Sequence, residues 1–239
     1  LTVVDSDPID LAVSNNQVSI LKHAVPFDES LIMFSDLQQF KLTSTDALTP
    51  LGATIDVATQ FETSTNVKPV AAGKFIYFPF KRGSFSGMRE YYVDMSTETN
   101  DAQEITAHCP EYLKGTLTKL VSSSNENILL VGTDDDKKVL YVYRWFWDNN
   151  QKLQSSWSKW IFDADVEGCT FLGSNIYILF NRSDAMYLEK INLSADDAES
   201  VMLDNQPVLL DRRVALKTGG TTSVPHTDSN LQYVVETGE

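Results

Sequence analysis

The chain of 239 residues is acidic, with 33 Asp and Glu against 19 Lys and Arg and a net charge of −14. This balance excludes a protein that grips nucleic acid over its general surface, because phosphate contacts need Lys and Arg. Cys109 and Cys169 are too few for a disulfide scaffold, and we expect both to be free thiols. The sequence has neither a signal peptide nor an apolar run of about 18 residues, so no membrane span is predicted.

The two ends of the chain suggest a piece of a longer polypeptide. The chain begins at Leu1 rather than Met, and it stops at Glu239 in mid-pattern. In Leu1–Asn16, apolar residues alternate with Asp and Ser, which predicts a short strand or two. The expected organisation is one β-propeller-like domain over residues 1–210, followed over 211–239 by a connector into a further domain. Such a propeller is expected to be incomplete because the chain is a fragment.

Four hairpins are predicted along the chain. In each, a run of β-branched and aromatic residues meets a polar turn and is followed by a second apolar run. The second is the clearest, since its runs flank the turn-rich stretch Gly83–Gly87. The paired runs are 31–34 with 40–42, 75–80 with 88–93, 128–131 with 139–143, and 176–180 with 186–191.

The spacing of these hairpins predicts the fold class. Their first strands begin at residues 31, 75, 128 and 176, at intervals of 44, 53 and 48 residues. Units of roughly 40–50 residues with several short strands each are typical of β-propeller blades. The chain is therefore predicted to be all-β, with four or more blade-like hairpin units. A large β-sandwich with recurring hairpins is the alternative.

Segments between the hairpins carry further predictions. Ala53–Glu62 and Thr116–Ser122 read as strands. At most one or two short helices are expected, with Asn100–Ala107 the best candidate, because Asn100 and Asp101 suit an N-cap and Pro110 would end the helix. Ser156–Phe162 reads as a strand that carries Trp157 and Trp160. Residues three apart in a strand face opposite sides, so one indole should be core and the other should meet a neighbouring surface. Trp160 is expected to be the more buried.

Candidate chemistry is sparse, and we assign no catalytic, cofactor-binding or metal-binding residue. Asp134–Asp136 lacks the ligand spacing of a calcium loop and suits a hairpin turn. His23, His108 and His226 are far apart and have no zinc-type spacing with Cys. Lys81-Arg82 with Arg89, and Arg212-Arg213, are expected to pair with acids within the fold. The carboxylates weighed as a glycosidase pair are Glu90, Asp94, Glu98, Asp101, Glu104, Glu111, Asp163, Asp165 and Glu167.

Several blocks of sequence resemble one known family. They are RGSFSGMREYYVD (82–94) with TNDAQEITAHCPEYLKG (99–115), LIMFSDLQQF (31–40) with LTP (48–50), and LYVYRW (140–145) with QSSWSKW (154–160). Together they span most of the chain, from about Leu31 to Leu193. In these blocks the chain is similar to the nozzle, or tail tubular, proteins of short-tailed bacteriophages. Since that family's proteins are several times longer, the match is to a middle segment.

The resemblance implies a structural virion protein rather than an enzyme. It implies a homo-oligomeric ring that adjoins a partner tail-tube (adaptor) protein and holds the tail fibres. It also implies a channel for transiting phage DNA without sequence-specific binding, and a location in the virion tail after assembly in the host cytoplasm. Acidity fits a DNA conduit, because each phosphate contact would have to break during transit.

A carbohydrate-active module on a propeller is the alternative function. It rests on the carboxylates and on four tryptophans that look exposed in the sequence, Trp145, Trp147, Trp157 and Trp160.

Overall fold

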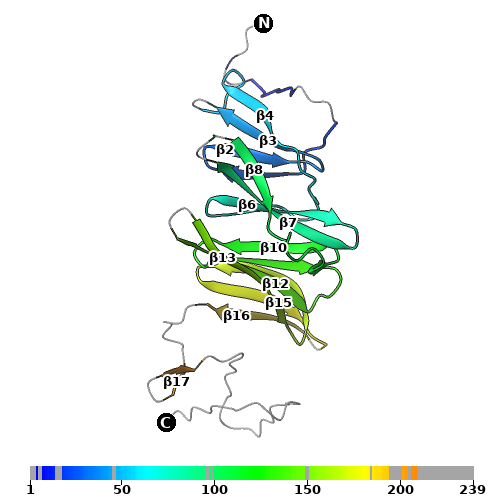
Figure 1. Ribbon diagram of the computed structural model, residues 1–239, viewed down its shortest axis with the longest axis vertical. Helices are drawn as coiled ribbons and strands as arrows, with labels where there is room; N and C mark the ends of the chain where they lie inside the picture. The colour runs from blue at the N-terminus through cyan, green and yellow to red at the C-terminus, as the bar shows by residue number, and fades with distance from the viewer. Residues whose placement is uncertain are drawn as a thin grey trace. The chain divides into compact units, whose positions relative to one another are not determined.

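A computed structural model describes residues 4, 7–13, 18–44, 47–94, 97, 99–148, 151–183 and 185–193, and the backbone of 201–203 and 206–208. The chain divides into two compact units, Leu1–Ser194 and Ala195–Glu239. Every regular element among the described residues is a β-strand (Figure 1). No helix in this part of the chain is long and apolar enough to cross a membrane. The predicted connector over 211–239 lies outside the described residues.

The described residues of unit Leu1–Ser194 form four antiparallel sheets whose main strands follow chain order. The first sheet has strands β1 (His23–Phe27), β2 (Ser30–Phe34), β3 (Gln39–Ser44) and β4 (Ala53–Thr59). The second has β5 (Val70–Ala72), β6 (Phe75–Arg82), β7 (Phe85–Asp94) and β8 (Thr99–Glu104), and β9 (Leu113–Lys114) pairs with β7. The third has β10 (Leu117–Ser123), β11 (Ile128–Thr133), β12 (Val139–Asp148) and β13 (Gln151–Ile161). The fourth has β14 (Asp165–Leu172), β15 (Asn175–Asn181) and β16 (Met186–Asn192).

The second unit contains one described hairpin, in which β17 (Val201–Leu203) pairs with β18 (Gln206–Val208). At the other end of the chain, Val4 and residues 7–13 form no strand. The strand predicted within Leu1–Asn16 is therefore not found in the described part of that segment.

All four predicted hairpins are confirmed, as β2–β3, β6–β7, β11–β12 and β15–β16. The turn of the second is shorter than its composition suggested. It consists of Gly83 and Ser84, and Gly87 lies inside β7 opposite Phe80. The Phe80 ring covers the space that a Cβ at position 87 would fill, 2.2 Å from its Cζ. Gly87 therefore permits close packing within a strand and does not form part of the turn.

The helix predicted over Asn100–Ala107 is wrong, because strand β8 occupies most of that segment. Tyr91 of β7 pairs with Ala102, and its hydroxyl donates to Asn100 Oδ1 at 2.8 Å. Asp101 Oδ1 accepts from the Ala102 amide at 2.7 Å. The two residues expected to cap a helix thus bond within the sheet. The free edge of β7 offers a ladder of hydrogen bonds that outweighs a weak local helix preference.

Three apolar cores lie between consecutive sheets. The first core joins the first and second sheets, the second core joins the second and third, and the third core joins the third and fourth. Successive strand residues point to opposite faces, so Leu129 of β11 enters the second core while Leu130 enters the third. The middle sheets are thus buried on both faces, which explains the continuous apolar runs Phe75–Phe80 in β6 and Ile128–Val131 in β11.

The strand β13 places Trp157 and Trp160 on opposite faces, as predicted. Trp157 packs against the second core and Trp160 against the third. Both indoles are half-buried, and the expected ranking of burial between them stays a prediction. Ile161, the apolar residue that follows Trp160, is 75% exposed.

Candidate functional site

The most distinctive polar group in unit Leu1–Ser194 is a buried ion pair between the second and third sheets. Lys152, near the start of β13, places its Nζ 2.6 and 2.7 Å from the two carboxylate oxygens of Glu90 on β7. The side chains are 19% and 3% exposed, respectively. Lys152 Nζ also donates to the Tyr143 hydroxyl of β12 at 3.4 Å. The pair therefore joins two sheets across the second core.

Aromatic rings surround this ammonium group. Lys152 Nζ lies 5.4 Å from the ring centres of Phe75 and Trp147 and 5.8 Å from that of Tyr143. Phe75 and Trp147 stack on each other across the same two sheets, with their centroids 5.2 Å apart. A desolvated ammonium is attracted to such ring faces. We call Lys152, Glu90 and these three rings the inter-sheet clamp.

Tyr77 borders the clamp and is fully buried. Burial and the nearby Glu90 carboxylate raise the pKa of its phenol well above the usual range. Burial likewise raises the pKa of Tyr143. Both phenols therefore stay protonated, and the clamp holds one negative and one positive group among neutral rings.

A second cationic residue, Arg89 of β7, lies between two phenylalanine rings. Its guanidinium carbon is 4.3 Å from the centre of Phe61 and 4.7 Å from that of Phe80. Burial is the main cause that lowers the pKa of Arg89. Nearby, Arg82 bonds Glu104 at 2.9 Å, so the predicted pairing of this basic cluster within the fold is confirmed for Arg82. The Arg212-Arg213 cluster lies outside the described residues.

Asp134–Asp136 forms the β11–β12 turn, as predicted, and its carboxylates serve three different partners. Asp134 Oδ1 accepts from the Thr116 amide at 2.7 Å. Asp135 pairs with Lys114 at 3.0 Å, and Asp136 accepts from the Lys138 amide at 2.9 Å. These carboxylates therefore fix a turn and its neighbours. Among the described residues, no group of three or more His, Cys, Asp or Glu is placed to hold a metal ion.

Several of the other carboxylates weighed for glycoside chemistry are taken up in ion pairs. Asp163 pairs with Arg182 at 2.9 Å, Glu167 with Lys137 at 3.7 Å, and Glu90 belongs to the clamp. Glu98 lies outside the described residues.

The histidine and cysteine side chains weighed as metal ligands have other surroundings. His23 Nε2 is 2.9 Å from the Thr65 carbonyl oxygen, so this histidine is tied to the backbone. The thiols of Cys109 and Cys169 are free and half-buried.

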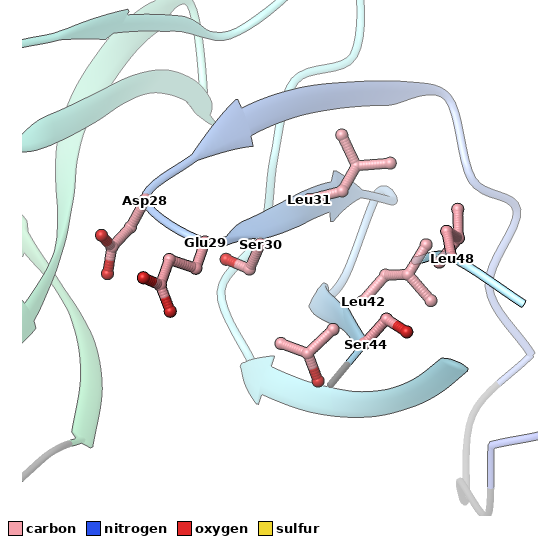
Figure 2. A pocket seen from close by; sticks show the side chains of 8 residues that line it. Asp28, Glu29, Ser30, Leu31, Leu42, Ser44 and Leu48 are labelled. Atoms are coloured by element: carbon pink, nitrogen blue, oxygen red, sulfur yellow. The ribbon is translucent and has the colours of Figure 1, made fainter. Parts of the chain in front are cut away.

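An open hollow of about 320 Å³ lies on the first sheet (Figure 2). Asp28 and Glu29 are adjacent on the β1–β2 turn at one side of it, and Leu31, Leu42 and Leu48 lie toward the other. Its two carboxylates are neighbours on one turn and do not face each other across the hollow. This arrangement lacks the opposed pair that glycoside hydrolysis needs.

The four tryptophans, which looked exposed in the sequence, are packed in cores. Trp145 is 7% exposed, and Trp147 and Trp157 pack on the second core with it. Trp157 also donates its indole N–H to the Ile105 carbonyl at 3.1 Å. Trp160 packs on the third core. The carbohydrate-active alternative, which rested partly on these rings looking exposed, loses that support because the inter-sheet cores take up the rings.

Sequence reasoning missed Lys152 altogether. A lysine beside a polar turn is usually a solvated residue, and nothing local distinguishes this one. Its partner Glu90 lies 62 positions earlier. Only the docking of the β12–β13 hairpin on β6 and β7 brings the two groups together.

Comparison with known proteins places this fold in a family. A model of the bacteriophage nozzle protein family matches residues 1–237. The tail tubular protein gp12 of Escherichia phage T7 is 34% identical over 194 residues, which is 80% of this chain and 24% of that protein. The chain thus spans about a quarter of that relative's length. On this evidence, the chain belongs to the bacteriophage nozzle protein family.

Proposed function

We propose that this chain is a structural segment of a phage tail nozzle, located in the virion tail. The observation that carries this proposal is the family match over residues 1–237. The described residues support it, because their distinctive polar contacts join sheets and turns instead of converging on a cleft. Contacts that join sheets and turns suit a rigid structural wall better than an active site. The segment is accordingly proposed to have no enzymatic activity.

We infer further that the sheets are blades of a propeller. The first and third are four-stranded antiparallel meanders in chain order, as in propeller blades, and the second is the same meander with β9 added beside β7. The first strands of successive sheets contact one another, β5 with β1 and β10, and β10 with β14. In a propeller these strands surround the central axis.

The fourth sheet supports the same inference through its uncovered face. One face of this sheet packs on the third core. The opposite face carries exposed apolar side chains, with Leu172 and Leu188 each 69% exposed and Met186 50% exposed. A further blade of the longer polypeptide would cover these side chains, as each earlier sheet is covered by the next.

In the tail, copies of the full-length protein are proposed to form a ring that adjoins the adaptor protein, holds the tail fibres and conducts phage DNA. The net charge of −14 supports a passive conduit, because an acidic wall repels phosphates. Assembly in the reducing host cytoplasm is consistent with free thiols at Cys109 and Cys169.

Cryo-electron microscopy of intact tails tests the structural proposal. We expect the four sheets to fit as consecutive blades in density repeated around the tail axis. A nozzle wall that has no density for these sheets would refute the proposal. A DNA-retardation assay near 150 mM salt tests the conduit, since an acidic wall should give no retained complex.

A carbohydrate-active module is not favoured, because its tryptophans are packed in cores and the hollow in Figure 2 lacks opposed carboxylates. Release of reducing sugar from host surface glycan, abolished by one carboxylate substitution, would instead support that function.

A further inference from the structure

The contacts between the second and third sheets are mainly nondirectional. The second core consists largely of aliphatic and aromatic side chains, among them Leu129, Val131, Tyr141 and Trp145. Burial of such groups is favourable but has little directional preference. A shift of one sheet along the other by two residues would again bring apolar side chains into the core, because side chains alternate with a period of two. Apolar burial alone therefore selects poorly between neighbouring arrangements.

Besides hydrogen bonds such as those from Trp157 to the Ile105 carbonyl and from Ser122 to the Ala71 carbonyl, two ion pairs between these sheets are directional, and they differ in burial. Lys114–Asp135 lies at the surface, with side chains 60% and 34% exposed. Lys152–Glu90 is buried, with both carboxylate oxygens within 2.7 Å of one ammonium. An exposed pair is screened by water and contributes little. In the buried pair, a slip of either sheet would leave two desolvated charges without partners.

We propose that the Lys152–Glu90 pair selects one docking arrangement between the second and third sheets and adds little net stability. Desolvation of two charges offsets most of their attraction, so an apolar replacement of both is often neutral. The same cost makes every arrangement that separates the charges unfavourable. The rings of Phe75, Tyr143 and Trp147 add to this selectivity, since the ammonium meets all three only in the observed position.

The first arm of the test compares three variants of the 239-residue chain by thermal unfolding. Lys152→Met and Glu90→Leu each leave one buried charge unpaired, and each should lower the melting temperature by about 10 °C. The double variant removes both charges and should melt within about 3 °C of the parent. A double variant that loses as much as the singles would contradict the proposal, because the pair would then supply net stability.

The second arm measures docking in that double variant, which is expected to fold. Spin labels at Gln103 of β8 and Ser156 of β13, both exposed, report the distance between the two sheets in a background with Cys109 and Cys169 replaced by Ala. Double electron–electron resonance spectroscopy should give one narrow distribution of the distance between the two labels for the parent. The double variant should give a broader or split distribution.

The matched control is Lys114→Met with Asp135→Leu, which removes the exposed pair at the same interface. The control should keep the narrow distribution, since this pair contributes little to docking. An unchanged narrow distribution in the buried double variant would overturn the proposal. Equal broadening in both variants would overturn it as well, since burial would then play no part.

Discussion

Replacement of Gly115 by Ala should disturb the junction between the second and third sheets. Gly115 has a φ of +87°, and a Cβ there would lie 2.4 Å from Asp134 Oδ1. The backbone at this position is held from both sides: its amide donates to the Ser84 carbonyl at 2.9 Å, and its carbonyl accepts from Ser86 Oγ at 2.7 Å. The chain therefore cannot move away from the β11–β12 turn without losing these bonds.

The size of the effect follows from three contributions. Left-handed backbone costs an alanine about 1–2 kcal/mol. Displacement of the Asp134 carboxylate breaks its hydrogen bond from the Thr116 amide, which contributes about 1 kcal/mol at an exposed site. Reduced freedom of the unfolded chain returns about 0.4–1 kcal/mol. The net loss is about 2 kcal/mol, equivalent to a fall of about 6 °C in melting temperature for a unit of this size.

Calorimetry on Gly115→Ala and a control variant tests this reasoning. Gly73 has a φ of +60° and nothing within 4 Å of a built Cβ, so Gly73→Ala keeps the strain and lacks the clash. It should lose about half as much stability. The double variant Gly115→Ala with Asp134→Ala should lose less than the sum of its singles, because the clashing carboxylate is gone. Equal losses for Gly115→Ala and Gly73→Ala would refute the steric argument.

Three further predictions concern the cores and one thiol. Gly87→Ala should cost about 2 kcal/mol in chemical denaturation because it displaces the Phe80 ring; a neutral result would mean that this ring moves freely. Trp157→Ala should lower the melting temperature more than Trp160→Ala, the reverse of the sequence-based ranking, because the Trp157 ring packs against Tyr143, with centroids 4.9 Å apart, and its indole donates a hydrogen bond. A larger loss for Trp160→Ala would restore that ranking. Burial raises the pKa of Cys169 from 9.0 to about 11, so its alkylation rate should rise through a midpoint near that pH. The stability linked to this thiol should be present below pH 9 and lost as pH rises toward 11; an alkylation midpoint near 9 would contradict the burial.

Local pattern was enough to find the hairpins, because each depends on residues close in sequence. The apolar runs around residues 31, 75, 128 and 176 became β2, β6, β11 and β15, and the three Asp residues at 134–136 became a turn. Alternation also placed Trp157 and Trp160 on opposite faces without knowledge of what lay beyond either face. The family blocks likewise identified the protein's class from sequence alone.

Tertiary structure decided whatever depends on contacts between distant segments. Asn100–Ala107 carries helix-start signals, yet the open edge of β7 converts most of it to a strand. The tryptophans look exposed in the sequence, but docking of the sheets covers their rings. Lys152 and Glu90, 62 residues apart, become a buried pair only because two hairpins stack face to face. The preference of a residue for helix or strand amounts to less than about 1 kcal/mol. Hydrogen bonds along a strand edge and contacts between packed sheets involve many residues at once, so they override these local preferences.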